Sequence, residues 1–183
     1  MAFILKKSVV LVGMMGAGKT AVGTALARQL GVQFCDSDDE IVQAANMSIP
    51  DIFSRDGEAF FRKREAEVLE RLLKGSPCIL STGGGAFLSA KNRDTIAQFG
   101  VSLWLKADLD LLWTRVRHRT TRPLLQTSDP RRTLAELCKV REHSYQQAAL
   151  MVTSEAFYSI EDMASKVVEK LLARPDLLEQ SNG

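Results

Sequence analysis

Gly13-Met14-Met15-Gly16-Ala17-Gly18-Lys19-Thr20 follows directly on the apolar run at residues 9–12 and precedes a helical pattern. The stretch matches the phosphate-binding pattern G-x-x-x-x-G-K-[ST], which requires a strand before it and a helix after it. Glycines let the backbone turn tightly and point successive N–H groups inward, Lys19 supplies a charge for the outer phosphates, and the Thr20 hydroxyl can bind Mg²⁺. The sequence therefore predicts a phosphate-binding loop rather than an ordinary glycine-rich turn.

Length and composition favour one domain, which we place at residues 1–175, with a flexible tail at 176–183. The 24 basic and 22 acidic side chains give a net charge of +2, which is too small to indicate a nucleic-acid or membrane surface. Cys35, Cys78 and Cys138 are odd in number and form no C-x-x-C pair, so reduced thiols are favoured over disulfides or a zinc site. No apolar run approaches the roughly 20 residues of a membrane span, and the N-terminal segment is too short for a signal peptide. We therefore expect a cytoplasmic protein.

Short apolar runs alternate with helical patterns along the chain. Strands are expected at residues 8–12, 32–35, 78–80, 101–105 and 150–153, and helices at about 19–30, 41–45, 48–56, 60–75, 89–98, 108–119, 129–149 and 159–174. This alternation predicts an α/β fold, a three-layer sandwich in which helices flank a five-stranded parallel sheet. Ligands collect at the carboxyl ends of such strands, so residues 13–20, 36–38 and 83–85 are expected at one edge of the sheet.

Two carboxylates, Asp36 and Asp38, follow the second predicted strand. If this segment is extended, both point the same way, and one could bind a metal ion while the other accepts a hydrogen bond from a substrate hydroxyl. The alternative is a solvated acidic turn that caps the next helix. The neighbouring phosphate loop favours the functional interpretation.

Arginines and glycines supply the remaining candidates. Arg62 could bind a carboxylate with its guanidinium fork, or it could belong to a basic helix face paired with Glu58 and Glu67, as we expect for Lys63. The run at residues 83–85 consists of three glycines, which would let a ligand approach the backbone N–H groups closely. An ordinary turn rarely needs three consecutive glycines.

The segment around residues 115–122 contains four arginines and no acidic residue. It could be a basic arm for nucleic acid, or a lid whose guanidinium reaches a transferring phosphoryl group. The stiff Arg122-Pro123 pair favours the lid. Arg141, farther along, could equally be a surface charge or a second carboxylate anchor.

Taken together, these residues resemble the shikimate kinase family over nearly the whole chain. The resemblance is carried by GMMGAGKT, FCDSD, DGEAFFRKRE, STGGGA, RPLL and VRE, in this order. It implies a P-loop kinase with the nucleoside-monophosphate-kinase type of fold, a substrate-binding segment at about residues 36–65 and a lid at about 115–130. The implied reaction converts ATP and shikimate to ADP and shikimate 3-phosphate, with Mg²⁺ as the cofactor.

The resemblance also implies roles for individual residues. Asp38, Lys19 and Arg122 would be catalytic, and Thr20 and Asp36 would bind the metal ion. ATP would be bound by Gly13, Gly16, Ala17, Gly18, Lys19, Thr20, Ala21, Arg115 and Arg122. Shikimate would be bound by Asp38, Arg62, Gly83, Gly84, Gly85 and Arg141, with Phe53, Phe61 and Pro123 as walls around its ring.

Two places depart from the family pattern. The segment at residues 152–155 lacks the aspartate often found after the last strand, and Ala156 stands where some members place an arginine near the adenine. Arg115 is the best match for the adenine-stacking position, although Arg119 competes with it.

Other functions compete with this one. They are a gluconate- or nucleotide-type kinase, a nucleic-acid-stimulated ATPase, and a member of the family that binds ATP without kinase activity. The absence of D-x-x-G and N-K-x-D argues against a GTPase switch. We expect a monomer that binds ATP and shikimate, and neither nucleic acid nor a membrane.

Overall fold

The computed structural model describes residues 2–118 and 123–182. Its strands are β1 (Ala2–Leu5), β2 (Ser8–Val12), β3 (Phe34–Asp36), β4 (Ile79–Ser81), β5 (Gly100–Lys106), β6 (Leu150–Thr153) and β7 (Leu178–Ser181). Its α-helices are α1 (Lys19–Leu30), α2 (Ser37–Ala45), α3 (Ile49–Asp56), α4 (Glu58–Leu73), α5 (Ala90–Phe99), α6 (Leu109–Val116), α7 (Pro130–Tyr145) and α8 (Ile160–Leu172). Two short 3₁₀ helices, η1 (Ala86–Leu88) and η2 (Pro123–Leu125), complete the elements.

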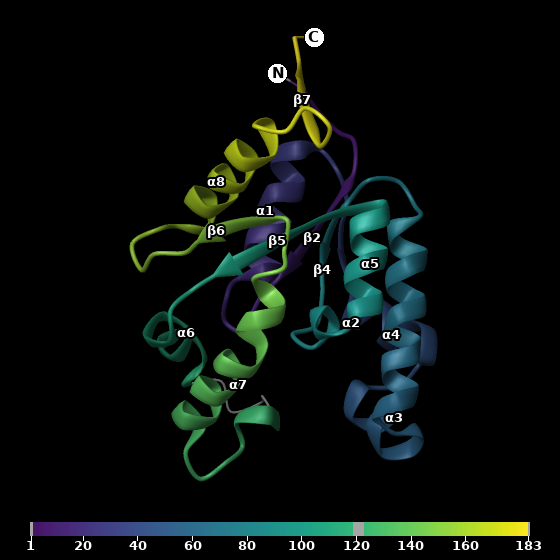
Figure 1. Ribbon diagram of the computed structural model, residues 1–183, viewed down its shortest axis with the longest axis vertical. Coiled ribbons are helices and arrows are strands. Elements are labelled where there is room, and N and C mark those ends of the chain that lie inside the picture. The colour runs from purple at the N-terminus through teal and green to yellow at the C-terminus, as the bar shows by residue number, and fades with distance from the viewer. Residues whose placement is uncertain (1, 119–122, 183) are drawn as a thin grey trace.

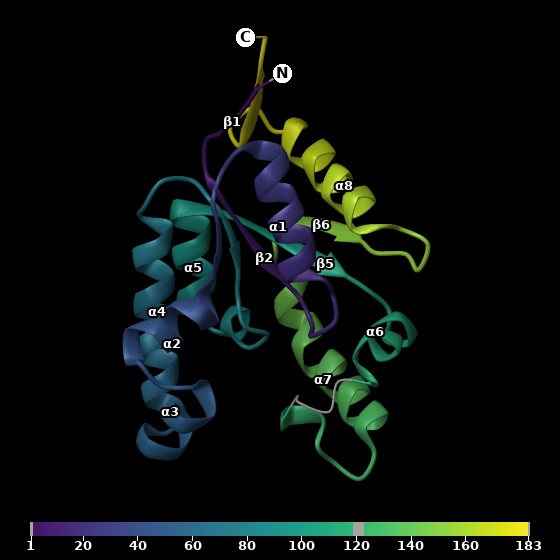
Figure 2. The same cartoon turned by 180° about the vertical axis from the view of Figure 1, so that it is seen from behind.

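Five parallel strands form the central sheet in the order β3-β4-β2-β5-β6. Helices α4 and α5 lie on one face of the sheet (Figure 1), and α1 and α8 lie on the other (Figure 2). Because both faces are covered, all five residues of β2 are buried, as expected for the central strand of a parallel sheet. The predicted α/β three-layer sandwich is confirmed.

The strand order places the chemistry-bearing segments side by side. Ser81 at the end of β4 is in register with Leu11 of β2 on one side and with Asp36 of β3 on the other. The phosphate loop, the acidic segment and the glycine run therefore leave three adjacent strands at the same edge. This is the juxtaposition that the parallel sheet predicted.

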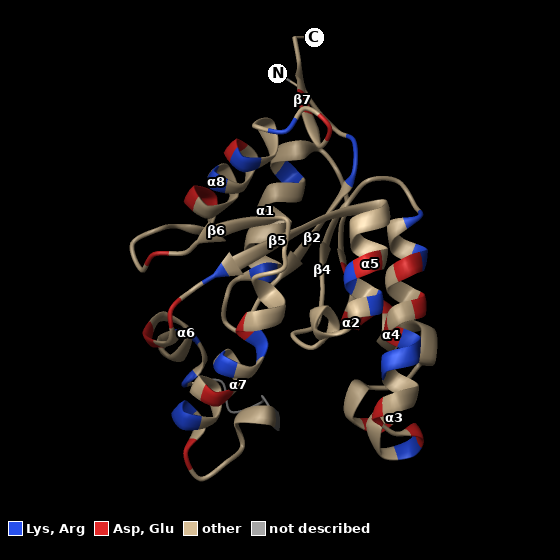
Figure 3. Ribbon diagram, in the orientation of Figure 1, with Lys and Arg blue, Asp and Glu red and all other residues tan. Residues whose placement is uncertain are grey.

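Two arms project beyond this edge of the sheet (Figure 1). One consists of α2, α3 and the first half of α4, and it has a small apolar core of its own, built from Ile41, Ile52, Phe61 and Val68. The other consists of α6, η2 and the first half of α7. Basic and acidic side chains are interleaved along α4 and α7 (Figure 3). The first arm corresponds to the predicted substrate-binding segment, and the second includes described parts of the predicted lid.

Side-chain caps explain where several helices begin. The side chains of Ser48, Ser89 and Ser159 each accept a hydrogen bond from the backbone N–H three residues later. The Asp162 carboxylate in turn accepts one from the Ser159 backbone N–H. The predicted starts of α3, α5 and α8 are thereby confirmed. Helix α2 begins four residues earlier than expected, because Asp36 caps it by accepting from the N–H groups of Asp38 and Asp39. The segment from Asp36 to Asp38 is therefore not extended.

The prediction of a flexible tail at 176–183 is wrong for most of that segment. Leu178–Ser181 forms β7, which pairs antiparallel with β1. Leu177 and Leu178 are each only 1% exposed, because they pack into the main core. The chain ends lie close together at the end of the molecule opposite the two arms (Figure 1). Both strands of this ribbon were missed from the sequence, because each has only four residues and β7 contains a single apolar residue, Leu178.

In the described part of the chain, none of the helices combines the length and the apolar character needed to cross a membrane.

Candidate active site

The phosphate loop has the backbone that its glycines predicted. Gly13, Gly16 and Gly18 have φ angles of 149°, 83° and 94°, which favour glycine. A Cβ at Gly13 would lie 2.9 Å from the Leu105 carbonyl oxygen, and one at Gly16 would lie 2.8 Å from the Val116 side chain. Backbone conformation and space therefore both require glycine at these two positions.

Helix α1 presents its N-terminus to this loop. The N-cap of this helix is Gly18, which has no side chain to cap it, so the first turn of α1 directs backbone N–H groups towards the position of a phosphate. The Lys19 ammonium donates a hydrogen bond to the Gly13 carbonyl, which keeps it folded over the loop. Lys19 and Thr20 both line an open cavity of about 1650 Å³ that extends from the loop between the two arms.

Arg115 connects the loop to the other side of the cavity. Its guanidinium donates to the Gly16 carbonyl at 3.0 Å and to the Ser154 hydroxyl at 3.2 Å, just after β6. Burial lowers the pKa of Arg115 from its usual value. This position, between the phosphate loop and the β6–α8 connection, agrees with a nucleotide-binding role, although stacking on adenine stays a prediction.

Each glycine of the run at 83–85 faces a different candidate side chain. A Cβ at Gly83 would lie 2.9 Å from the Asp38 carboxylate, and one at Gly85 would lie 2.7 Å from the Arg62 guanidinium. At Gly84 a Cβ would overlap the guanidinium of Arg141. The three glycines leave room for three charged side chains from α2, α4 and α7 that converge on this turn.

The backbone of the glycine turn offers hydrogen-bond donors to the cavity. Among the described residues, the N–H groups of Gly83, Gly84 and Gly85 have no acceptor, whereas the Gly83 carbonyl accepts from Ala86. The turn continues into η1, which is anchored by Asn92, whose amide donates to the Ala86 carbonyl at 2.9 Å. A ligand in the cavity can therefore approach several backbone donors of residues that have no side chain of their own.

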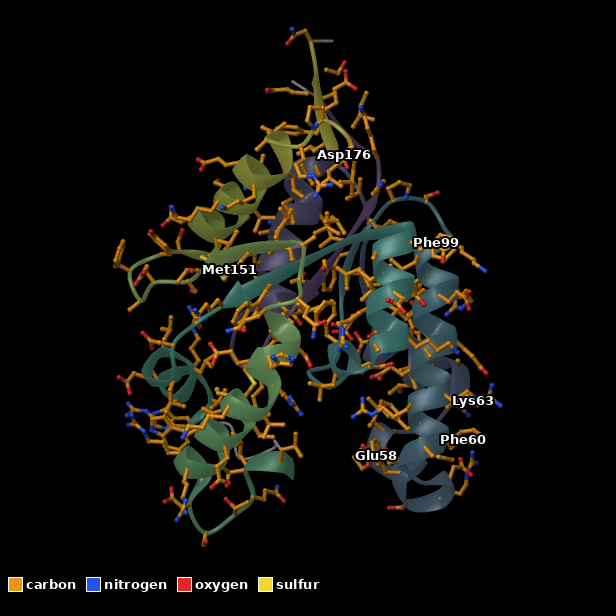
Figure 4. The ribbon with its side chains drawn as sticks, viewed as in Figure 1. Glu58, Phe60, Lys63, Phe99, Met151 and Asp176 are labelled. Atoms are coloured by element: carbon orange, nitrogen blue, oxygen red, sulfur yellow. The ribbon has the colours of Figure 1, made fainter. Side chains whose placement is uncertain are left out.

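Arg62 is held by two acidic residues of its own helix. Its Nη1 lies 2.9 Å from the buried Glu65 carboxylate and its Nε lies 3.7 Å from Glu58. Glu58 lies on the side of α4 that faces the other arm, whereas Phe60 and Lys63 point away from the cavity (Figure 4). Lys63 is therefore on an outer helix face, as expected, but the predicted pairing is wrong, because Glu58 pairs with Arg62 and Glu67 pairs with Arg64.

Arg141 is not a surface charge, because it is only 9% exposed. It lies on α7 one turn before Tyr145, whose hydroxyl donates to the Gly84 carbonyl at 2.6 Å. The structure thus excludes the surface charge, and the role of a carboxylate anchor stays a prediction. Arg62 of α4 and Arg141 of α7 flank the same glycine turn.

Three carboxylates in this site have pKa values above their ordinary range. Burial raises the pKa of Asp38 to about 6, with further contributions from the charges of Asp36 and Glu65 and an opposing one from Lys19. Burial also raises the pKa of Asp36 and of Glu65, the latter opposed by Arg62. Because Lys19 and Asp38 influence one another, the phosphate loop and the glycine turn belong to one site.

Most predicted site residues meet in this cavity. Phe53 and Phe61 line it with ring centroids 4.8 Å apart, as expected for a wall. Arg122 and its competitor Arg119 lie outside the described residues, as does the side chain of Pro123. The prediction omitted several residues that line the cavity or contact its predicted site residues: Ile49, Pro50, Glu58, Glu65, Leu124, Leu137, Tyr145 and Ser154.

A signal for the two acidic residues was present in the sequence. Glu58 and Glu65 are four residues before and three residues after Arg62, which puts them on its helix face. Tyr145 is four residues after Arg141 and so shares its helix face in the same way. Such spacing shows proximity but cannot show which face points into a cavity.

The family model for shikimate kinase matches residues 15–172. The chain belongs to the shikimate kinase family. It is 62% identical to the shikimate kinase of Ruegeria pomeroyi over 180 residues, which cover 98% of this chain and 92% of that protein. This degree of similarity spans both arms and the sheet.

Solved structures of the family have the same fold. The shikimate kinase from Acinetobacter baumannii in complex with shikimate superposes with a TM-score of 0.85 at 38% identity, covering 92% of this chain and 94% of that one. A gluconokinase from Sinorhizobium meliloti reaches a TM-score of 0.55 at 16% identity, which shows a shared fold alone.

Proposed function

We propose that the chain transfers the γ-phosphoryl group of ATP to a hydroxyl of shikimate, giving ADP and shikimate 3-phosphate. This product lies on the route to chorismate and the aromatic amino acids. The observation that carries the proposal is the glycine turn at residues 83–85, where Asp38, Arg141 and Arg62 each face one glycine beside a phosphate loop. Membership of the family supports the same reaction.

The nucleotide half of the site is the phosphate loop. Its N–H groups and the N-terminus of α1 would bind the β- and γ-phosphates, and Lys19 would exchange its bond with the Gly13 carbonyl for the outer phosphates. Arg115 borders the same half of the cavity. Arg122, as the lid arginine that meets ATP, remains a prediction.

Thr20 and Asp36 fit a magnesium ion. Both line the cavity, and the two bonds that Asp36 accepts from the backbone go to Oδ1, which leaves Oδ2 for the ion or for a water bound to it. The described residues contain no cluster of three or more His, Cys, Asp or Glu side chains that could hold a metal, so nucleotide phosphates and water would complete the coordination. When bound, Mg²⁺ neutralises charge on the phosphate oxygens.

The acceptor half must bind a ring that carries one carboxylate and several hydroxyls. Arg62 and Arg141 would bind the carboxylate through charge-assisted hydrogen bonds. The N–H group of Gly84 would donate to the substrate, and Phe53 and Phe61 would pack against the ring. Asp38 lies beside Gly83 and close enough to Lys19 for the charge of Lys19 to lower its pKa. It would contact the hydroxyl that reacts.

Positioning and charge neutralisation would supply most of the rate, because phosphoryl transfer needs little covalent chemistry from the protein. The hydroxyl oxygen of the acceptor bonds to the γ-phosphorus, while the bond from that phosphorus to the oxygen bridging it to the β-phosphate breaks and ADP leaves. The hydroxyl proton passes to Asp38. A carboxylate whose pKa is raised to about 6 is a better base than an exposed aspartate.

A panel of acceptors tests the reaction. ADP release should depend on shikimate, and gluconate and AMP should give no release above the ATP-only rate, since gluconate has no ring to pack against Phe53 and Phe61 and AMP has no carboxylate for the two arginines. Turnover of gluconate or AMP in preference to shikimate would contradict the proposal. Salt-sensitive binding of DNA or RNA would contradict our expectation that the protein has no nucleic-acid partner.

Two neighbouring arginines test the role of the acceptor half. Arg62→Ala should raise the KM for shikimate by about 100-fold or more and leave the KM for ATP within about twofold, because it removes a charged partner of the carboxylate. Arg64→Ala is the matched control, since Arg64 is exposed and pairs with Glu67 on the outer face of α4. Equal effects of the two substitutions, or an effect confined to the KM for ATP, would refute the assignment.

We further propose that the enzyme acts as a monomer in the cytoplasm. The reduced thiols expected from the sequence support the cytoplasmic location. A measured molecular mass near 20 kDa in solution would agree with a monomer.

A further inference from the structure

Tyr145 is a buried phenol that the proposed mechanism has not used. It is the last residue of α7, it is 1% exposed, and its ring packs against Trp104 of β5 with centroids 5.9 Å apart. A buried tyrosine hydroxyl usually has a polar partner. Here the partner is the Gly84 carbonyl, at 2.6 Å.

This bond fixes the orientation of one peptide unit in the glycine turn. The Gly84 carbonyl and the Gly85 N–H belong to the same planar trans peptide and point in opposite directions. No cis peptide bond occurs in the described residues. A carbonyl held towards α7 therefore aims the Gly85 N–H away from Tyr145. Glycine imposes little restraint on its own backbone, so this turn needs a restraint from outside.

The same hydroxyl also contacts Arg141. Arg141 and Tyr145 are four residues apart on α7, so their side chains lie on one face of the helix. A Cβ built on Gly84 would meet both groups. It would overlap the Arg141 guanidinium and lie 3.7 Å from the Tyr145 hydroxyl oxygen. Burial raises the pKa of the Tyr145 phenol, and the neighbouring Arg141 guanidinium opposes this effect through its charge and as a hydrogen-bond donor. The phenol oxygen can accept from Arg141 while its own proton goes to Gly84.

We propose that Tyr145 is a positioning residue for the acceptor. Its hydroxyl holds the Arg141 guanidinium and the glycine turn in one fixed relation, so that both can bind the same molecule of shikimate. Tyr145 acts through these two groups and not by touching the reacting atoms. The inference rests on the proposed function, because it assigns shikimate to the space between Arg141 and the turn.

Tyr145→Phe tests the role of the hydroxyl. The substitution keeps the ring against Trp104 and removes only the two hydrogen bonds. We expect the KM for shikimate to rise about tenfold, as for the loss of one or two buried hydrogen bonds. The KM for ATP should stay within about twofold, because Gly13 to Thr20 are untouched.

Ser102→Ala is the matched structural control. Its hydroxyl is also buried and also bonds to the backbone, accepting from the Ala149 N–H at 2.9 Å, but it lies away from the cavity. This variant should lower Tm by an amount similar to Tyr145→Phe and leave both KM values unchanged. An unchanged KM for shikimate in Tyr145→Phe, or equal changes in both KM values in the two variants, would overturn the proposal. Failure of Tyr145→Phe to fold would also overturn it, because the hydroxyl would then be a structural group.

A double-mutant cycle separates the two arginines. The effect of Tyr145→Phe on the KM for shikimate should be smaller in an Arg141→Ala background, where only the effect through the glycine turn remains, and should persist in full in an Arg62→Ala background. Equal effects in both backgrounds would contradict the positioning role. If the wild type did not phosphorylate shikimate at all, the proposed function itself would fail. If only the coupling were absent, this inference alone would fail.

Discussion

Asp38 shows how single residues acquire their chemistry from their surroundings. It lies in the first turn of α2, beside Gly83, with three other acidic residues, Asp36, Glu65 and Asp39, close enough to affect it. An aspartate in water would be fully ionised at neutral pH and a weak base. Burial near Asp36 and Glu65 makes this one more basic, and Lys19 limits the effect.

The pH dependence of the reaction should report this raised pKa. The pKa of Asp38 is about 6 in the ligand-free protein, so the active carboxylate is lost as the pH falls through 6. We expect kcat/KM for shikimate, measured at saturating ATP, to be level above about pH 7 and to fall roughly tenfold per pH unit well below pH 6. A profile that stays level down to pH 5 would contradict this assignment.

At the scale of elements, the phosphate loop depends on its backbone as much as on Lys19. The loop is clamped between β5 and α6, because Gly13 approaches Leu105 and Gly16 approaches Val116. Arg115 adds a bond from α6 to the Gly16 carbonyl. A side chain inserted here would therefore move the N–H groups that should bind phosphate.

Two glycines with positive φ separate this effect from general backbone strain. Gly16→Ala should weaken ATP binding by about tenfold or more, because it adds strain at φ 83° and a close contact with Val116. Gly31→Ala places alanine at φ 68° in the cap of α1, where nothing lies within 4 Å of the new Cβ. It should cost about 1 kcal/mol of stability and leave the KM for ATP unchanged. Calorimetric titration with a non-hydrolysable ATP analogue measures the affinity of both variants, and equal losses of affinity would contradict the account.

Some elements could be predicted from sequence, and others depend on tertiary contacts. The loop, α1 and the capped starts of α3, α5 and α8 follow from local signals within a few residues. The early start of α2 was missed because capping by the acidic turn was treated as the alternative to a functional role, whereas Asp36 does cap α2. The roles of Glu65 and Tyr145 depend on which helix face turns inward, and periodicity alone does not determine that.

At the scale of the whole molecule, the β1–β7 ribbon ties the two ends of the chain to the core. Residues 2–5 and 178–181 have little apolar periodicity, so neither strand is predictable without its partner. Leu177 and Leu178 are buried against the same core as the sheet. The ribbon thus contributes to stability far from the active-site cavity.

Removal of the C-terminal strand should therefore affect stability more than catalysis. Deletion of residues 177–183 removes two buried leucines and exposes the part of the core that they cover. It should lower the free energy of unfolding by roughly 3–6 kcal/mol. Deletion of residues 182–183 alone is the control and should change it by less than about 0.5 kcal/mol. Urea unfolding measures the difference. Equal stability of the two truncated proteins would contradict the structure of this segment.

The account claims that the phosphate loop and the glycine turn form one site for two substrates, with Asp38 between them. The most direct test is to measure shikimate 3-phosphate formed from ATP and shikimate by the wild type and by Asp38→Asn, with ATP affinity determined separately. We predict a Mg²⁺-dependent product with the wild type, and a kcat reduced by about 10²–10⁴ in the variant with ATP affinity unchanged. Turnover by Asp38→Asn at the wild-type rate, or no shikimate 3-phosphate from the wild type, would contradict the account.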